Sequence, residues 1–216
     1  MVPWPTISTV LLDMDGTLLD LHYDNHFWRV HVPQRYAEKN GLTAAVAQDL
    51  LATRFKRAEG TLDWYSVDYW THELGLDIAL LKSEIQHLIA IHPHVNKFLD
   101  SLRAQKKRVV LVTNAHGKSL YLKLGRTRLG GHFDAIVCAH DLGLPKEHIE
   151  FWTRMQQTQP FTKDTTLFID DSLPVLRSAH RYGIAHLLAI RRPDSQGQDK
   201  DVGEFDAING FHEIMP

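Results

Sequence analysis

The residues of this chain best suited to chemistry are two acids separated by one residue, Asp13 and Asp15. They directly follow residues 10–12, an apolar run with the character of a buried strand. Because side chains alternate along a strand, both carboxylates should leave its carboxyl end on the same side. Two carboxylates so close repel each other unless a cation lies between them or one holds a proton. Gly16 allows a sharp turn there, so the motif predicts a reactive site and not a packing contact.

Three further polar motifs follow later apolar runs, and the first is Thr113 with Asn114. A hydroxyl, an amide and backbone N–H groups at the start of a helix can form a cradle for an anion. The second is Lys146, which we expect to open the helix after the third strand. A cation there opposes the helix dipole unless it faces an anion. Taken alone, each motif is better explained by an ordinary helix cap or a surface lysine.

The third motif is the pair Asp170 and Asp171, which comes at the end of another apolar run. Adjacent acids after a buried strand suit a hard, oxygen-seeking cation such as Mg²⁺. Acids and glycine are also ordinary turn residues, so neither acid pair decides the matter alone. Four strand ends, however, offer in order an acid pair, a hydroxyl, a lysine and a second acid pair, and this combination favours a functional site.

Short aliphatic runs alternate with helix-like stretches, and this alternation predicts an α/β fold with a parallel sheet covered on both faces. Ligand sites in such sheets lie beyond the carboxyl ends of the strands, where Asp13, Thr113 and Asp170 are placed. The expected strands are residues 10–12, 109–112, 135–138, 166–169 and 186–190, and the expected helices are 95–105, 118–124, 148–157 and 174–182, with a polar loop over 193–203 before a short terminal helix.

The interval between the first two strands is far longer than one crossover helix requires. It contains several helix-like stretches and no convincing strand. We predict a core domain of residues 1–18 and 92–216, with a helical cap of residues 19–91 over its site. The expected cap helices are residues 26–39 (kinked or split at Pro33), 43–58, 63–74 (with Asp63 as N-cap) and 77–91 (with Asp77 as N-cap).

Bulk composition limits the partners and the location of the protein. The 216 residues are 44% hydrophobic and 23% charged, which is typical of a soluble globular protein, and the net charge is −2. This balance gives no reason to expect nucleic-acid binding, which needs a basic excess. No apolar run is long enough to span a bilayer, and the chain starts without a signal-peptide pattern. We therefore expect a cytoplasmic protein with no membrane partner, and the sequence carries no sign of its oligomeric state.

The order of the four motifs resembles the signature of the haloacid dehalogenase superfamily of phosphohydrolases, and the likeness covers the whole chain. The resemblance implies a Rossmann-like three-layer core and a cap of the type inserted after the first motif. Within the superfamily the chain looks most like the bacterial GMP/IMP nucleotidases. The stretches that carry this narrower likeness are residues 11–21, 24–25, 27–28, 39–41, 62–65, 68–70, 74–78 and 113–116.

Carried over position by position, the resemblance implies a catalytic role for each motif. Asp13 would attack phosphorus to give an aspartyl-phosphate. Asp15 would protonate the leaving oxygen and later take a proton from the hydrolytic water. Thr113, with Asn114 and neighbouring N–H groups, would hold the phosphoryl oxygens. Lys146 would offset charge between the nucleophile and the phosphate.

The resemblance also implies Mg²⁺ as cofactor. The ion would be held by a carboxylate oxygen of Asp13, the backbone carbonyl of Asp15 and Asp171. Asp170 would act through a metal-bound water or by orienting Lys146, and the sequence leaves open which acid of this pair contacts the metal. A phosphate monoester brings about two negative charges at neutral pH, so a carboxylate nucleophile needs such screening to approach it.

The expected partner is a small phosphorylated metabolite, most specifically a purine nucleotide such as GMP or IMP. Asp15 favours phosphate substrates, because the dehalogenases of the superfamily lack an acid at its position. Asn25 and Trp28 closely follow the catalytic turn, so they are the candidate substrate contacts in the cap. A sugar phosphate or phosphoglycolate is an alternative substrate. A non-catalytic phosphate-binding protein is a third hypothesis, and the intact motif set argues against it.

Overall fold

All strands of the sheet run parallel, as the alternation of apolar runs and helices predicts. The computed structural model describes residues 2–216, and its sheet has the strand order β3-β2-β1-β4-β5-β6. The predicted strands are confirmed, and the additional strand β6 is too short for any apolar pattern to show. The bounds are β1 Thr9–Leu12, β2 Arg108–Thr113, β3 Ala135–Cys138, β4 Thr166–Asp170, β5 His186–Ile190 and β6 Ala207–Ile208.

The register places the carboxyl ends of the central strands at one level. Leu12 of β1 lies beside Leu111 of β2 and Ile169 of β4. The next residue, Asp13, donates its backbone N–H to the Ile169 carbonyl at 3.0 Å. The polar motifs that follow β1, β2 and β4 therefore meet at one edge of the sheet, as the sequence predicted.

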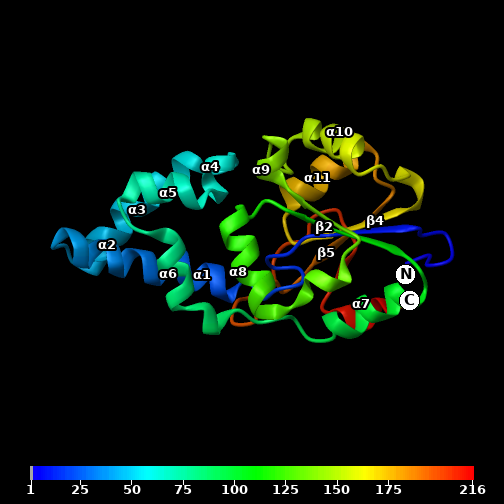
Figure 1. Cartoon of the computed structure of the whole chain (residues 1–216), viewed down its shortest axis with the longest axis horizontal. Helices are drawn as coiled ribbons and strands as arrows, with labels where there is room; N and C mark the ends of the chain where they lie inside the picture. The colour runs from blue at the N-terminus through cyan, green and yellow to red at the C-terminus, as the bar shows by residue number, and fades with distance from the viewer. Residues whose placement is uncertain (1) are drawn as a thin grey trace.

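Helices cover both faces of the sheet and bury alternate side chains of each strand. The core helices are α7 Val95–Ala104, α8 Gly117–Thr127, α9 Ala139–Leu142, α10 Ile149–Thr158 and α11 Leu173–Tyr182, with 3₁₀ segments η3 Leu129–His132, η4 Lys163–Thr165 and η5 Phe211–Ile214. Leu12 packs in one apolar cluster with Phe98 of α7, whereas Leu11 packs in another with Phe151 of α10. Figure 1 shows α9, α10 and α11 on one side of the strands and α7 on the other. This is the predicted three-layer α/β fold.

The turn that carries Lys146 differs from its prediction. The sequence predicted that Lys146 opens the helix after β3, and this was wrong. The short helix α9 follows β3 directly, and α10 begins only at Ile149, with His148 at its N-cap position. Lys146 lies in the turn between them, where its backbone N–H donates to Asn114 Oδ1 at 2.9 Å. This long-range hydrogen bond fixes the turn, and no local sequence pattern predicts such a bond.

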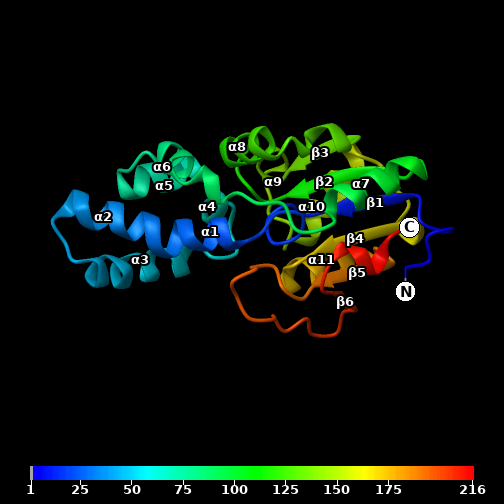
Figure 2. The same cartoon turned by 90° about the horizontal axis from the view of Figure 1, so that it is seen from below.

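The segment between β1 and β2 folds as helices, as predicted, and lies beyond the carboxyl ends of the strands (Figure 2). These helices are called the cap below. They are α1 His22–His26, the π-helical turn η1 Phe27–His31, α2 Val32–Asn40, α3 Ala44–Ala58, α4 Leu62–Tyr65, α5 Val67–Leu74, α6 Ile78–Glu84 and the 3₁₀ turn η2 Gln86–Leu88. Within residues 2–216, no helix combines the length and apolar character needed to cross a membrane.

The helix predicted over residues 63–74 is in fact the two helices α4 and α5. Ser66 has an extended backbone that interrupts the helix, and its hydroxyl accepts the Tyr69 N–H at 3.1 Å as the N-cap of α5. Asp63 lies in the first turn of α4, so its predicted N-cap role was wrong. The serine hydroxyl offers the backbone an alternative to a continuous helix.

Two other cap helices also differ from prediction. The helix predicted over residues 77–91 ends at Glu84, although Asp77 is its N-cap as expected and accepts the Leu80 N–H at 2.9 Å. Pro33 does not split its helix, because the backbone stays helical from the π-helical turn η1 through His31 and Val32 into α2. A proline inside a helix removes one hydrogen bond of the ladder, and the helix changes here from π-helical to α-helical winding directly before it.

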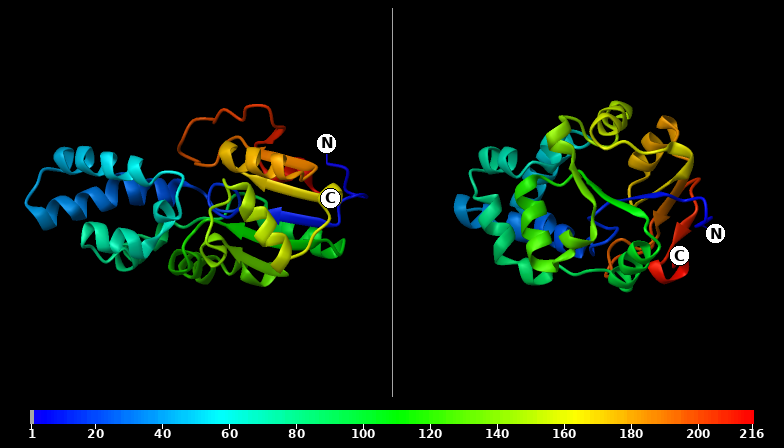
Figure 3. Two further views of the ribbon diagram at one scale, coloured as in Figure 1. Left: turned by 90° about the horizontal axis from the view of Figure 1, so that it is seen from above. Right: turned by 45° about the vertical axis from the view of Figure 1, so that its right-hand side comes forward.

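The two chain segments that connect the cap to the core run side by side. Leu19 forms an antiparallel bridge with Ile91, and the Asp20 N–H donates to the Ala90 carbonyl at 3.0 Å. Figure 3 shows the cap at one end of the elongated molecule, with the sheet and its helices at the other. These contacts support our proposal that residues 19–91 form a unit distinct from the core.

Candidate active site

A pocket of about 570 Å³ lies between the carboxyl ends of the strands and the cap. Its volume is in the range that holds small-molecule ligands. The structure brings every residue that the sequence assigned to a site to the wall of this pocket. They are Asp13, Asp15, Asn25, Trp28, Thr113, Asn114, Lys146, Asp170 and Asp171.

Lys146 forms a buried ion-pair centre between two strand ends. Its Nζ donates to Asp13 Oδ1 at 2.5 Å, to Asp170 Oδ2 at 2.7 Å and to the Val112 carbonyl at 3.1 Å. Burial disfavours the ammonium, but attraction to Asp13 and Asp170 outweighs it and raises the pKa of Lys146. Lys146 is therefore a fixed positive charge in contact with the carboxylate that the sequence predicts as nucleophile.

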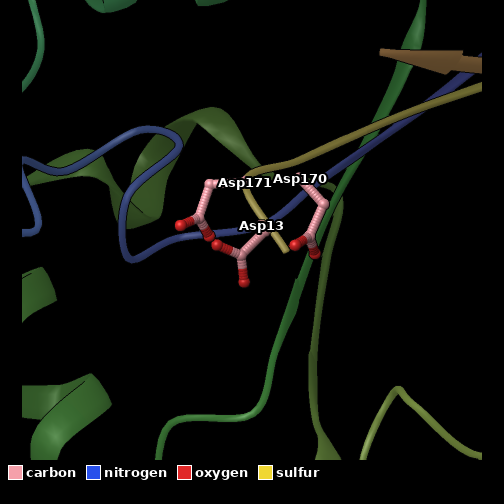
Figure 4. Close-up of side chains that lie close together, drawn as sticks. All are labelled: Asp13, Asp170 and Asp171. Atoms are coloured by element: carbon pink, nitrogen blue, oxygen red, sulfur yellow. The ribbon is translucent and has the colours of Figure 1, made fainter. Parts of the chain in front are cut away.

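Three carboxylates meet beside this lysine, as Figure 4 shows for Asp13, Asp170 and Asp171. One oxygen from each lies within 4.8 Å of the others, a spacing that suits a shared metal ion. Burial raises the pKa of Asp170 well above its usual range, in spite of the nearby lysine. Both Asp170 oxygens have partners, because Oδ2 accepts from Lys146 and Oδ1 accepts the Ser172 N–H at 2.9 Å. Carboxylate oxygens are the donors that Mg²⁺ prefers, so this donor set fits such an ion.

Asp171 is the member of the cluster with the most accessible partner. Its Oδ2 pairs with Lys200 Nζ at 2.7 Å, and the Lys200 side chain is 45% exposed. Gly16 packs against Asp171, since a Cβ on Gly16 would lie 2.8 Å from its carboxyl carbon. With a φ of 86° as well, this position requires glycine. The turn after β1 can therefore approach the second acid pair closely.

Thr113 and Asn114 occupy the end of β2 as predicted, but they differ in what they offer a ligand. The Thr113 hydroxyl accepts the Ala115 N–H at 3.0 Å and still has a proton to donate. Both polar atoms of the Asn114 side chain already have partners within the protein. Its Oδ1 accepts the Lys146 N–H, and its Nδ2 donates to Glu147 at 2.9 Å. Asn114 thus braces the turn that carries Lys146, and a phosphate contact from Asn114 stays a prediction.

The Asp15 carboxyl is not a member of the carboxylate cluster and contacts helix α8. Its Oδ1 lies 2.7 Å from Nζ of Lys123, whose side chain is only 1% exposed. Burial, with repulsion from Asp24 and Asp13, raises the pKa of Asp15 to about 7 although Lys123 opposes the rise. A carboxyl group with this pKa can either hold or release a proton near neutral pH, as general acid–base chemistry requires.

Comparison with known proteins identifies the family. Residues 10–189 match the model of the haloacid dehalogenase-like hydrolases, a span that includes all four motifs. The chain belongs to the haloacid dehalogenase-like hydrolase family. The GMP/IMP nucleotidase YrfG of Escherichia coli K12 is 37% identical to this hydrolase over 215 residues, which cover 100% of this chain and 97% of that protein.

Two more distant proteins agree with this placement of the hydrolase. A HAD phosphatase from Thermococcus onnurineus superposes with a TM-score of 0.80 over 96% of both chains, at 20% identity. The glyceraldehyde 3-phosphate phosphatase of Methanocaldococcus jannaschii is 21% identical over 129 residues, which cover 59% of this chain and 56% of that one. At 20% identity, the structural likeness to the Thermococcus protein establishes the fold alone.

Aromatic rings of the cap form the side of the hydrolase pocket that faces away from the strand ends. Trp28, Phe55 and Trp64 line it, with ring centroids 5.5 Å apart for Trp28 and Phe55 and 6.2 Å apart for Phe55 and Trp64. Arg29 and Glu59 also line the pocket, and neither forms an ion pair with any other of residues 2–216. The cap thus offers stacking surfaces together with a free cation and a free anion.

The two predicted cap contacts have structural partners of their own. Trp28 is half-buried and packs edge-on against Phe27 at 4.9 Å, so part of its ring belongs to the cap core. Asn25 donates from Nδ2 to Asp194 at 2.6 Å and ties the cap to a core loop. Both side chains line the pocket, and substrate contact by either stays a prediction.

Sequence reasoning missed several charged residues of this hydrolase site, above all Lys123. One signal could have indicated it. Lys123 lies three positions after Leu120 on the face of α8 that the core buries, so it is a cation at an inward-facing helical position. Glu147 and Lys200 carried no comparable signal, because both lie in loops.

Proposed function

We propose that this protein hydrolyses purine nucleoside 5′-monophosphates such as GMP and IMP, with Mg²⁺ as cofactor and a phosphorylated Asp13 as intermediate. The chain is a phosphoric monoester hydrolase of its family, so the proposal concerns its substrate, its metal and its intermediate. The observation that carries it is the pocket in which Asp13 and Lys146 face the aromatic wall of the cap. The E. coli relative, of which 97% is matched, is named for GMP and IMP, which supports this choice.

Asp13 is the nucleophile in this proposal. Its Oδ2 forms no bond to the lysine, whereas Oδ1 is held by Lys146. Attack of a carboxylate oxygen on phosphorus forms the aspartyl-phosphate as the bond to the leaving oxygen breaks. The Thr113 hydroxyl donates to a phosphoryl oxygen, and Lys146 balances the negative charge that nucleophile and phosphate bring together. Water then attacks phosphorus, which releases phosphate and restores Asp13.

Asp15 moves the protons of both steps. Its carboxyl group gives a proton to the leaving 5′-oxygen, because an alkoxide is too basic to leave unprotonated near neutral pH. The resulting carboxylate then accepts a proton from the attacking water, which returns Asp15 to its first state. A pKa of about 7 allows one residue to serve in both directions.

Asp13, Asp171 and the backbone carbonyl of Asp15 would hold Mg²⁺. Bound there, the ion would screen the phosphate from the carboxylates and stabilise charge on the phosphoryl oxygens. Asp171 is the better direct ligand of the second acid pair, because both oxygens of Asp170 are engaged by Lys146 and the Ser172 N–H. Asp170 would then orient Lys146.

Removal of divalent cations is expected to abolish phosphate release. Without the ion, the three carboxylates of the cluster face the incoming dianion, and the lysines paired with them are Lys146 and Lys200. The measurement is phosphate release after EDTA treatment and gel filtration, followed by titration with Mg²⁺, Ca²⁺ and Zn²⁺. Restoration by Mg²⁺ is the expected result, and full turnover in the metal-free protein would contradict the assigned cofactor.

A substrate screen tests the proposed nucleotide preference. Purified protein with Mg²⁺ would be assayed for phosphate release from GMP, IMP, AMP, pyrimidine monophosphates, sugar phosphates and phosphoglycolate. The highest kcat/KM is expected for GMP and IMP. A preference for a sugar phosphate or phosphoglycolate would retain the chemistry of the strand-end residues and reject the nucleotide assignment.

The variant Trp28→Ala extends this screen to the cap. If Trp28 stacks on the base, its loss should raise KM for GMP by about 5- to 150-fold, which corresponds to the free energy of one base–aromatic stack. The kcat/KM for a small phosphate such as phosphoglycolate should change little, because that substrate does not reach the ring. Tyr121→Ala is the matched control, since Tyr121 is 77% exposed on core helix α8. An unchanged KM for GMP in folded Trp28→Ala would remove Trp28 from the binding site.

A further inference from the structure

Four charged side chains of alternating sign form a continuous chain from the catalytic turn into the cap. Asp15 Oδ1 lies 2.7 Å from Lys123 Nζ, and Lys123 Nζ donates to Asp24 Oδ2 at 2.6 Å. Asp24 Oδ1 in turn accepts from Lys82 Nζ at 3.1 Å. The chain runs from the turn after β1 through core helix α8 to cap helices α1 and α6. It therefore joins the proposed acid–base residue to both sides of the cap–core junction.

Packing alone does not explain this chain of charges. The side chains of Lys123 and Lys82 are 1% and 5% exposed. Burying an ammonium and its partner carries a large desolvation cost, and apolar residues of similar volume often stabilise a fold as well or better. A Met or Leu at position 123 would continue the apolar face that Leu120 begins. The charge on Lys123 therefore indicates a task other than filling space.

The geometry around Lys123 is asymmetric in a way that suits catalysis. Its hydrogen bond goes to Asp24 of the cap, whereas its contact with Asp15 lacks hydrogen-bond geometry. Oδ1 of Asp15 is buried and accepts no hydrogen bond from residues 2–216. The ammonium thus holds Oδ1 of the Asp15 carboxyl by charge, and Oδ2 is the oxygen left to exchange a proton with a leaving group or a water.

We propose that Lys123 is a positioning residue for Asp15, anchored from the cap by Asp24, and that it fixes the Asp15 carboxyl where it serves the leaving oxygen. This inference rests on the proposed acid–base role of Asp15. Since Asp24 belongs to α1, the arrangement is complete only when the cap lies over the core.

The dependence of rate on the leaving group tests this inference directly. Phenyl phosphate and 4-nitrophenyl phosphate are similar in size, but the nitrophenolate leaves readily without a proton. Asp15→Asn should therefore lower kcat/KM for phenyl phosphate much more than for 4-nitrophenyl phosphate. Lys123→Met should do the same, with a loss on the order of 10²-fold for phenyl phosphate, the lower end of what general acid catalysis contributes. If Lys123 only held the cap and the core together, its replacement would lower kcat/KM for both substrates equally.

A second variant and a control complete the experiment. Asp24→Asn keeps Lys123 beside Asp15 but weakens its anchor, so it should show the same selective loss to a smaller extent, even if Lys123→Met does not fold. Arg126→Met, an exposed position on the same helix α8, should leave both rates unchanged. Folding of each variant would be checked by circular dichroism.

The outcomes separate this inference from the proposed function. A selective loss shared by the Asp15, Lys123 and Asp24 variants supports it. Equal losses for both substrates in folded Lys123→Met or Asp24→Asn, with a selective loss in Asp15→Asn, overturn the positioning role and leave the proposed function intact. Lack of turnover in the unaltered protein with Mg²⁺ overturns the proposed function and this inference together.

Discussion

Asp13→Asn is expected to lose turnover by at least about 10⁴-fold, because the amide cannot attack phosphorus to form the covalent intermediate. The variant should nevertheless fold. Asparagine has nearly the shape of aspartate, its carbonyl oxygen can still accept from Lys146 Nζ, and Lys146 keeps its partner Asp170. The measurement is phosphate release from GMP with Mg²⁺, alongside thermal unfolding of both proteins. The loss should therefore appear in kcat and not in the folded fraction.

The control for this variant is Asp49→Asn, which makes the same chemical change at an exposed position on α3. That variant should retain full activity. Both proteins would be purified until no phosphatase of the expression host remains, because a trace of host enzyme would mimic residual turnover. Activity of purified Asp13→Asn near that of the control would sink the proposed covalent mechanism.

Lys146→Met is expected to damage stability and activity together. Lys146 is the one cation in contact with both Asp13 and Asp170 among the residues that the structure describes. Removing one partner of a buried ion pair leaves uncompensated charge and costs about 3–5 kcal/mol in the free energy of unfolding. The loss of an ammonium that faces the phosphoryl group should also lower kcat on the order of 10³-fold.

Urea unfolding in EDTA measures the change in the free energy of unfolding for Lys146→Met, and phosphate release with Mg²⁺ measures the change in kcat. The two media matter, because a bound cation would partly replace the lost ammonium and mask the destabilisation. Lys97→Met is the matched control, since Lys97 is exposed on α7 and should change the unfolding free energy by less than about 0.5 kcal/mol. A change in Lys146→Met as small as in this control would contradict the buried ion-pair centre.

The parallel core was accessible to sequence reasoning because its signals are local and repeated. Each central strand is an apolar run followed at once by its polar motif, so strand and motif are read together. The register then follows from the parallel pairing, which aligns Leu12 with Leu111 and Ile169. The helices of the cap were harder to delimit, because single side chains such as Ser66 end or restart them.

The residues of the site also differ in how far the sequence predicts them. The sequence by itself determined that Asp13, Thr113 and the second acid pair lie at strand ends, since motif order and parallel topology suffice for that, whereas Lys146 reaches the site from a turn between α9 and α10. Only the tertiary structure decided which charges meet. Lys123 and Asp24 are 99 positions apart, yet they share a hydrogen bond in the buried junction between core and cap. Helical periodicity places a residue on a face, whereas its partner is chosen by how separate elements pack, and no local pattern encodes that choice.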